Sequence, residues 1–187
     1  MNACILIRHG ATDMAGRFCG HCDPPLNNAG RAQIDRVASI LSASPEVIYC
    51  SDLLRAQESA AILGNRLAVP VEVRSGLREI GFGQWEGLSW QEIELSFPVE
   101  SQTWIEKFPL GAIPSGERYD DFRDRVRNEI AFLSAQAESR ALMAVTHGGF
   151  IRTALLDVYS ISSDQAHQLS AEYAATVDLS QLHAGAR

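Results

Sequence analysis

Two histidines in this sequence occupy the same kind of position, after a short apolar run and directly before a glycine. His9 follows the run 5–7 and Arg8, whereas His147 follows the run 141–145 and one threonine. Continuous apolar runs of this length are typical of strands buried on both faces of a parallel sheet. Ligands of open α/β sheets bind outside the carboxyl ends of the strands. We therefore expect the two imidazoles to face one ligand site at one edge of the sheet.

Arginine and glycine residues belong to the same predicted site. Arg8 adjoins His9, and Arg55 lies in the first turn after the apolar run 47–50, a further predicted strand. Guanidinium groups bind phosphate oxygens through paired N–H donors, and a helix that begins after Gly148 would point free backbone N–H groups at an anion. A single histidine or arginine in such a place is usually structural, but two equal strand endings favour a binding site. The combination predicts a pocket for a tetrahedral dianion such as a phosphate ester.

The hydrophobic pattern indicates the elements that must position these residues. Strands are predicted at 3–7, 47–50, 69–73, 141–145 and 176–179, and helices at 31–42, 53–67, 89–97, 118–135 and 149–159. Strands that alternate with helices and read as continuous apolar runs indicate an α/β fold, a three-layer α/β/α sandwich with a mostly parallel sheet. The stretch 98–117 holds three prolines and two glycines and is expected to be irregular. Together with residues 76–97, it is long enough to form a roof over a site.

The predicted helix at 53–67 carries two more specific expectations. Ser51 or Asp52 is expected to cap its first turn, because both side chains accept hydrogen bonds from free backbone N–H groups. Its inward-facing apolar side chains are expected to be Leu54, Ala61 and Ile62.

Composition limits the class of protein. The chain has 187 residues, 46% hydrophobic and 21% charged, which is typical of a globular protein, and a single domain over residues 1–187 is expected. A formal net charge of −7 argues against a non-specific nucleic-acid binder. The sequence shows no signal-peptide pattern and no apolar run near the roughly 20 residues that span a bilayer. We expect a cytoplasmic protein with a small-molecule partner and neither a nucleic-acid nor a membrane partner.

Six ordered motifs resemble the histidine phosphatase superfamily, the phosphoglycerate mutase-like group, over residues 3 to about 155. They are Arg8-His9-Gly10 with Thr12, Pro25-Leu26 with Gly30, Ser51-Asp52-Leu53-Leu54-Arg55-Ala56, Leu77-Arg78-Glu79 with Gly83-Gln84-Trp85-Glu86-Gly87, Pro114-Ser115-Gly116-Glu117 and Thr146-His147-Gly148-Gly149. The resemblance implies a phosphoglycerate mutase-like fold. It also implies a phosphoric monoester hydrolase that needs no metal and no other cofactor.

The resemblance also implies roles for individual residues. His9 would be the nucleophile that becomes phosphohistidine, and Glu79 would donate a proton to the leaving oxygen. The phosphoryl oxygens would be held by Arg8, Arg55 and His147, with Gly148 beside them. Gly20 and His21 lie in a loop that the resemblance places next to the phosphate. One departure concerns Ala15, where many members carry asparagine, so that Arg17 or backbone would have to supply one phosphate hydrogen bond.

Within the family, the segments 20–26 and 114–117 and the Trp104 region are most similar to the α-ribazole phosphatases of cobalamin biosynthesis. The resemblance thus implies α-ribazole 5′-phosphate as substrate. A broad-specificity small-molecule or sugar phosphatase, or a phosphoglycerate mutase-like enzyme, is the alternative. An aromatic leaving group could stack on Trp104 and Phe108 in the roof.

A competing motif is the C-x-x-C segment formed by Cys19 and Cys22, which is also found in thiol–disulfide oxidoreductases. That chemistry requires the first cysteine at a helix N-terminus, but two prolines follow here at 24–25 and cannot continue a helix. A zinc site would need further ligands, for which Cys4, Cys50 and His21 are candidates. The favoured interpretation of Cys19 and Cys22 is a plain loop beside the phosphate pocket.

Three other features are expected at the surface. The charge-rich stretch 117–127 is interpreted as the solvated face of the long helix at 118–135. His167 and His183 belong to no motif and are expected to be exposed.

Overall fold

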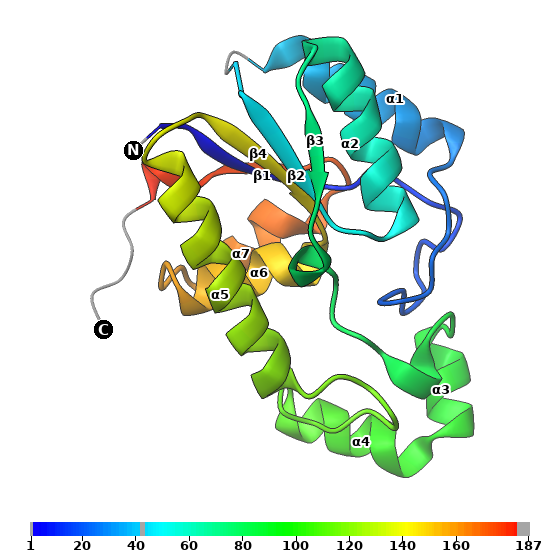
Figure 1. Ribbon diagram of the computed structural model, residues 1–187. Coiled ribbons are helices and arrows are strands. Elements are labelled where there is room, and N and C mark those ends of the chain that lie inside the picture. Colours follow the sequence, from blue (N-terminus) through cyan, green and yellow to red (C-terminus); the bar gives the residue numbers. More distant parts are fainter. Residues whose placement is uncertain (1, 42–43, 183–187) are drawn as a thin grey trace.

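A five-stranded sheet forms the centre of the computed structural model, which describes residues 2–41 and 44–182 (Figure 1). In the order β3-β2-β4-β1-β5, the strands are β1 Cys4–Arg8, β2 Val47–Cys50, β3 Val71–Val73, β4 Leu142–Thr146 and β5 Thr176–Asp178. The first four strands are parallel, and β5 runs antiparallel to β1. The predicted mostly parallel sheet is confirmed.

Helices cover both faces of this sheet, α1 and α2 on one face and α5, α6 and α7 on the other (Figure 1). Their bounds are α1 Asn28–Ile40, α2 Leu54–Leu67, α5 Tyr119–Ala137, α6 Gly148–Asp157 and α7 Ser163–Ala171. Because successive side chains of a strand point to opposite faces, Ile5 and Ile7 pack in the core beneath α1 and α2, whereas Cys4 and Leu6 pack beneath α5 and α6. The three-layer α/β/α sandwich is confirmed.

The register of the two central strands brings their ends together. β1 pairs with β4 so that Arg8 lies opposite Thr146, and the backbone N–H of His9 donates to the Thr146 carbonyl at 3.0 Å. His9 and His147 therefore leave the sheet side by side, at the edge where β2 also ends and α2 begins.

The expected cap of α2 was wrong. Leu53 is the N-cap residue and supplies no side-chain bond; instead the Leu54 N–H donates to Oδ1 of Asp23, 2.5 Å away. Ser51 accepts from the Leu53 N–H, and Asp52 forms an ion pair with Arg78, so neither caps the helix. Asp23, from a loop distant in the sequence, therefore accepts the hydrogen bond of a free N–H group in the first turn of α2.

The inward face of α2 also differs from the expectation. Leu54 and Ala61 are exposed and Ile62 is half-buried, while the buried side is formed by Arg55, Ala56, Ser59, Ala60, Leu63 and Gly64. The helix is turned so that a guanidinium faces the interior, which apolar periodicity does not predict.

The prolines and glycines of the stretch 98–117 predicted an irregular chain, but part of this stretch is helical. Pro98 stands at the first position of helix α4 (Pro98–Lys107), where its missing N–H costs no hydrogen bond. Helix α3 (Trp90–Ser96), which confirms the helix predicted at 89–97, directly precedes α4. They pack on a small separate core of Trp85, Ile93 and Ile113. We call residues 82–113 the roof; it projects beyond the carboxyl edge of the sheet (Figure 1).

Helix α7 had no counterpart among the predicted elements. Ser162 caps it by accepting from the Gln165 N–H, and only Ala166 and Ser170 are buried along it, so it shows no clear apolar stripe. His167 on this helix is exposed as expected, and His183 lies outside the described residues. Among residues 2–41 and 44–182, no helix has the length and apolar character needed to cross a bilayer.

Candidate active site

His9 is the most tightly constrained side chain at the carboxyl edge of the sheet. It is 6% exposed; its Nδ1 lies 2.7 Å from the Gly10 carbonyl oxygen, and its Nε2 lies 3.2 Å from Nε of Arg55. A carbonyl oxygen only accepts, so Nδ1 carries the proton, and Nε2 presents a lone pair that receives the Arg55 N–H. In this tautomer the lone pair of Nε2 could act as a nucleophile.

Burial and two cations keep this imidazole neutral. Loss of hydration, followed by the charges of Arg55 and Arg8, lowers the pKa of His9 to about 3, although its hydrogen bond to Gly10 acts in the opposite direction. A neutral ring is required for nucleophilic attack.

His147 faces His9, with the two ring centroids 5.1 Å apart. It is fully buried at the N-cap position of α6, and burial, together with the neighbouring His9, Arg55 and Arg8, holds the pKa of His147 well below its ordinary value. Neither ring nitrogen has a hydrogen-bond partner among the described residues, and the same holds for Nε of Arg8. Buried polar atoms are rarely left unpaired in native structures, so these three nitrogens point to a missing polar ligand.

The two arginines are held by backbone carbonyls. Arg55, 1% exposed, donates to the carbonyls of Cys19, Gly20 and Cys22 in addition to His9. Arg8 donates to the carbonyls of Ser170 and Ala171, and its guanidinium carbon lies 4.3 Å from the centre of the Tyr173 ring.

Neither arginine forms an ion pair with a carboxylate of the described residues. A buried cation whose partners are all neutral is strongly attractive to an anion. The two guanidinium groups of the site are therefore not neutralised by an ion pair, although the whole chain is acidic.

Glu79 lies next to the histidines and is almost completely buried. Its Oε2 accepts from the Gly149 N–H at 2.8 Å in the first turn of α6, and Oε1 accepts from the Ile80 N–H at 3.0 Å. A Cβ atom at position 149 would lie 2.3 Å from Oε1 of Glu79, so only glycine leaves room for the carboxyl group. The close approach of backbone and carboxylate explains the glycine at this position.

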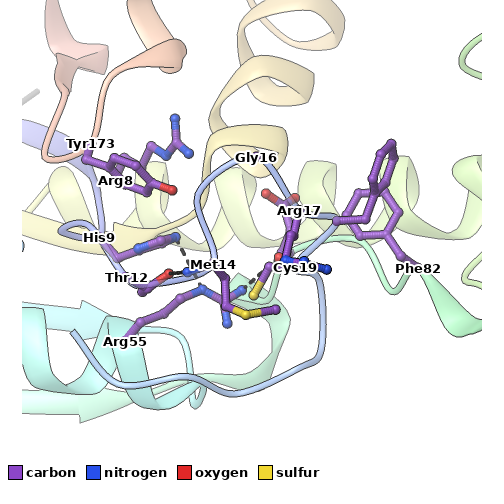
Figure 2. A pocket seen from close by; sticks show the side chains of 12 residues that line it. Arg8, His9, Thr12, Met14, Gly16, Arg17, Cys19, Arg55, Phe82 and Tyr173 are labelled. Atoms are coloured by element: carbon purple, nitrogen blue, oxygen red, sulfur yellow. Dashed lines mark hydrogen bonds between the residues drawn. The ribbon is translucent and has the colours of Figure 1, made fainter. Parts of the chain in front are cut away.

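These groups open into a pocket of about 280 Å³ (Figure 2). Its lining includes four of the expected residues, Arg8, His9, Arg55 and Glu79, together with Thr12, Met14, Gly16, Arg17, Phe18, Cys19, Phe82 and Tyr173. Figure 2 shows the side chains of Arg8, His9 and Arg55 around the hollow. The volume is suited to one phosphoryl group with part of its ester.

The other expected residues do not line this pocket. His147 and Gly148 lie behind His9 and Arg8, where a Cβ at position 148 would be 3.2 Å from Cζ of Arg8. Gly20 is buried, and its carbonyl accepts a hydrogen bond from Arg55. His21 is exposed, and its Nε2 lies 3.1 Å from the Glu79 carbonyl oxygen. The structure thus places Gly20 and His21 as supports of the site.

Three residues that hold the site were not identified from the sequence: Tyr173, Glu86 and Arg125. Glu86 accepts four backbone N–H groups, from Gly20, His21, Cys22 and Phe82. Tyr173 packs on the His9 ring, with 5.7 Å between centroids. Glu86 lies in the motif at 83–87, so the sequence could have indicated its role, whereas Tyr173 belongs to no motif.

Arg125 corrects the view that the stretch 117–127 is only a solvated helix face. Its guanidinium is half-buried, pairs with Glu117 at 2.7 Å and donates to the carbonyls of Gly76, Arg78 and Glu79. Glu117 also accepts from the Gly81 N–H. Arg125 and Glu117 together fix the backbone on both sides of Glu79.

A second, larger cavity of about 910 Å³ adjoins the phosphate pocket and shares Phe18 and Phe82 with it. Its walls come from the roof and from α5, α6 and α7, and include Trp104, Phe108, Tyr119, Phe122, Arg152, Asp164, His167 and Gln168. We call it the leaving-group cavity, because it begins beside the pocket and next to Gly149, which binds Glu79.

Metal-ligating side chains do not gather in the described part of the chain. No group of three or more histidine, cysteine, aspartate and glutamate side chains there could hold a metal ion. Cys4 and Cys50 are buried in the cores on opposite faces of the sheet, so they cannot join Cys19 and Cys22 in a zinc site.

Comparison with known proteins agrees with this geometry. Glucosyl-3-phosphoglycerate phosphatase from Mycobacterium tuberculosis is 34% identical over 158 residues, which are 79% of this chain and 70% of that protein. Adenosylcobalamin/alpha-ribazole phosphatase from Escherichia coli is 29% identical over 149 residues, which are 78% of this chain and 73% of that protein. The crystal structure of the alpha-ribazole phosphatase from Shigella flexneri superposes with a TM-score of 0.82 at 25% identity, covering 91% of this chain and 86% of that one.

The family model described as histidine phosphatase superfamily (branch 1) matches residues 4–186, nearly the whole chain. The named relatives of this chain are phosphatases, and the structure has their phosphoglycerate mutase-like fold. This chain is a phosphatase that belongs to the histidine phosphatase superfamily.

Proposed function

We propose that this phosphatase hydrolyses phosphate monoesters through a phosphohistidine at His9. The observation that carries the proposal is the set of cations in the pocket wall: Arg8, Arg55 and the neutral His9 line the pocket, His147 packs against His9, and neither arginine forms an ion pair with a carboxylate of the described residues. A phosphoryl dianion would supply the missing charge and the missing hydrogen-bond partners.

In the first step, Nε2 of His9 attacks phosphorus while the bond between phosphorus and the ester oxygen breaks. The incoming group displaces the Arg55 N–H from Nε2, so that Arg55 turns its donor to a phosphoryl oxygen. Nε of Arg8 and the one protonated ring nitrogen of the neutral His147 donate to the other oxygens. These groups stabilise the charge of the transition state, which is the main task in phosphoryl transfer.

Glu79 supplies the proton that the leaving oxygen needs. Its carboxyl group lines the pocket and is held by two backbone N–H groups, so it is oriented before substrate binds. In the second step the same carboxylate takes a proton from a water molecule, whose oxygen attacks phosphorus and releases His9. Orthophosphate leaves, and the carboxyl group has regained its proton.

We propose α-ribazole 5′-phosphate as the substrate. The leaving-group cavity next to the pocket has aromatic walls, including Trp104 and Phe108, whose rings lie 4.8 Å apart in an edge-to-face arrangement. Such walls suit a leaving group with a flat aromatic ring joined to a sugar. The likeness to the Escherichia coli and Shigella flexneri phosphatases supports this choice.

A sugar phosphate with a carboxylate is the second candidate. Arg152 lines the leaving-group cavity, and among the described residues its guanidinium donates only to Oγ of Ser170, at 3.3 Å. A guanidinium with donors to spare suits a carboxylate or another polar group of the ester. The 34% identity to glucosyl-3-phosphoglycerate phosphatase supports this alternative.

The test is a panel of esters assayed side by side: α-ribazole 5′-phosphate, glucosyl-3-phosphoglycerate, small sugar phosphates and p-nitrophenyl phosphate, with phosphoglycerate mutase activity measured in parallel. We expect the highest kcat/KM on α-ribazole 5′-phosphate and a labelled phosphohistidine after rapid quenching. Equal kcat/KM values across the panel would instead establish a broad phosphatase.

A metal chelator serves as the control for the mechanism. We expect no change of activity in its presence, because every group that the proposed steps use is a side chain of the protein. A clear loss of activity would contradict the phosphohistidine route.

A further inference from the structure

Two thiols lie together in the wall of the phosphate pocket. Cys19 lines the pocket (Figure 2), and the thiol of Cys22 donates to Sγ of Cys19 across 2.7 Å. Both cysteines are free and half-buried. A disulfide needs about 2.05 Å between its sulfur atoms, so a small approach of the two side chains is enough to join them.

The loop that carries these thiols is bound on two sides. On one side, Glu86 accepts the N–H groups of Gly20, His21 and Cys22. On the other side, the carbonyls of residues 19, 20 and 22 accept from Arg55, which donates to Nε2 of His9. Arg55 therefore connects the loop that carries the two sulfur atoms to His9, the proposed nucleophile.

The surroundings of the pair differ from those of a disulfide-exchange enzyme. Such enzymes place the first cysteine at a helix N-terminus, whose dipole stabilises the thiolate. Here residues 18–27 form no helix, and Arg55 is the cation nearest to the loop carbonyls. The pair is thus built into a phosphatase pocket and has no redox active site of its own.

We propose that Cys19 and Cys22 form a reversible disulfide, and that this modification changes the affinity of the pocket for phosphate esters. The inference rests on the proposed function of that pocket. The oxidant is a low-molecular-weight disulfide of the glutathione class, and Cys19 is partly exposed to it.

The two thiols have unequal acidity, which sets the order of the steps. The hydrogen bond from Cys22 and the nearby charge of Arg55 lower the pKa of Cys19, against the effects of burial and of Glu86 and Glu79. The same hydrogen bond and burial raise the pKa of Cys22. Cys19 is therefore the attacking thiolate, because the thiolate and not the thiol is the nucleophile.

The exchange takes two steps that balance. The Cys19 thiolate attacks one sulfur of the oxidant, a mixed disulfide forms, and the first small thiolate leaves. Cys22 then loses its proton and attacks Sγ of Cys19, so that the Cys19–Cys22 bond forms and the second small thiolate leaves. The protein has lost two electrons and two protons, and the oxidant has become two thiols.

Oxidation changes the charge of the pocket wall more than its shape. A Cys19 thiolate places a negative charge beside the cations that attract the phosphoryl dianion, whereas the disulfide is neutral. The loop keeps its bonds to Glu86 and Arg55 because the sulfur atoms need to move only a little. We therefore expect the oxidised form to bind phosphate esters more tightly.

The first measurement maps the disulfide and does not depend on activity. The purified full-length protein is equilibrated with oxidised and reduced glutathione at several ratios, treated with iodoacetamide and examined by peptide mass spectrometry. We expect a Cys19–Cys22 cross-link that dithiothreitol reverses, while Cys4 and Cys50, which are fully buried, are alkylated only after denaturation. Alkylation of Cys19 and Cys22 at every ratio would overturn the inference.

The second measurement compares kinetics of the two forms at a pH of about 8.5, near the ordinary pKa of a thiol. We expect KM for p-nitrophenyl phosphate to be about threefold lower in the oxidised protein, since one negative charge has been removed near the dianion. Cys22→Ser lacks the resolving thiol, so it should stop at the mixed disulfide on Cys19 and should not show this fall in KM, whereas Cys50→Ala, which keeps the pair, should respond as the wild-type protein does.

Two results would count against the inference: unchanged kinetics in the fully oxidised protein, or an equal response of Cys22→Ser. An inactive reduced wild-type protein that still forms the disulfide would count against the proposed function instead. The two proposals can therefore fail separately.

Discussion

The phosphate pocket and the roof are held together by different forces. In the pocket, the ends of β1 and β4 and the start of α2 fix charged or polar side chains, and carbonyl oxygens hold the guanidinium groups of Arg8 and Arg55. In the roof, edge-to-face aromatic contacts of Trp85 and Trp104 surround a small apolar core. Leu95 and Val99 of the roof are 84% and 72% exposed.

From this difference we expect the pocket to determine the reaction and the roof to determine which substrate is preferred. Hydrogen bonds and charge fix positions to within tenths of an ångström, as the transfer of a phosphoryl group requires. Apolar contacts are less directional, so a roof made of them can change its residues while the sheet edge keeps its chemistry. Substitutions in the two regions should therefore have different kinetic signatures.

The largest effect is expected for His9→Ala. Without a nucleophile in the pocket, kcat on p-nitrophenyl phosphate should fall at least about 10⁴-fold, as for other nucleophile deletions. His21→Ala, at an exposed loop histidine whose Nε2 lies 3.1 Å from the Glu79 carbonyl, is the matched control and should lose less than about tenfold. Similar losses of kcat in both variants would contradict the assignment of His9 as the nucleophile and of His21 as a residue that only supports the pocket.

Glu79→Gln should be next in size, and its effect should depend on the leaving group. For an alkyl phosphate, kcat/KM, which reports the first step and not the hydrolysis of the phosphohistidine, should fall about 10²- to 10³-fold, because the amide cannot donate the proton that an alkoxide needs. For p-nitrophenyl phosphate the loss should be smaller, because p-nitrophenolate leaves without a proton. Glu72→Gln, on the exposed strand β3, is the control. Equal losses on both esters would contradict the role of Glu79 as a proton donor.

Arg125→Lys should lower kcat about tenfold or more with little change in KM. Lysine cannot reproduce the several bonds to Glu117 and to the carbonyls around Glu79, so the carboxyl group would lose its fixed orientation. Arg127→Lys is the matched control, since Arg127 is on the same helix and pairs with Asp157 instead. A change in KM alone, or equal effects of both variants, would contradict a positioning role.

Phe108→Ala should have the smallest effect, confined to bulky esters. The exposed ring forms part of the leaving-group cavity, and its loss should raise KM about fivefold for an ester with an aromatic leaving group, within the usual range for one ring contact. Leu110→Ala, an exposed roof residue outside the cavity lining, is the control. A fall in kcat on small esters would show that roof and pocket are not separate.

The sheet and the convergence of the histidines were predictable from the sequence because they follow local rules. Buried parallel strands require continuous apolar runs, and β1, β2 and β4 show them. A histidine placed after two neighbouring strands must reach the same edge. His9, His147 and Arg55 could therefore be grouped without coordinates.

Helix α4 of the roof, helix α7 and the role of Arg125 were not predictable, because their signals are non-local or ambiguous. Pro98 indicated an irregular chain, but a proline is equally compatible with the first turn of a helix. Helix α7 buries Ala166 and Ser170, which give no apolar stripe. The sequence predicts a surface position for Arg125, because the carbonyls that it binds lie 46 to 49 positions away in the chain.

The antiparallel direction of β5 has a consequence for the order in which the molecule is completed. It brings residues 170–175 back to β1, where Ser170 binds Arg8 across 162 positions of sequence and the Ala174 N–H binds the His9 carbonyl. During synthesis on the ribosome, Arg8 can be held in place only after residues 170 and 171 have been added to the chain. The parallel strands β1, β2, β3 and β4 all precede these residues in the sequence, so the parallel part of the sheet can form before the proposed pocket is complete.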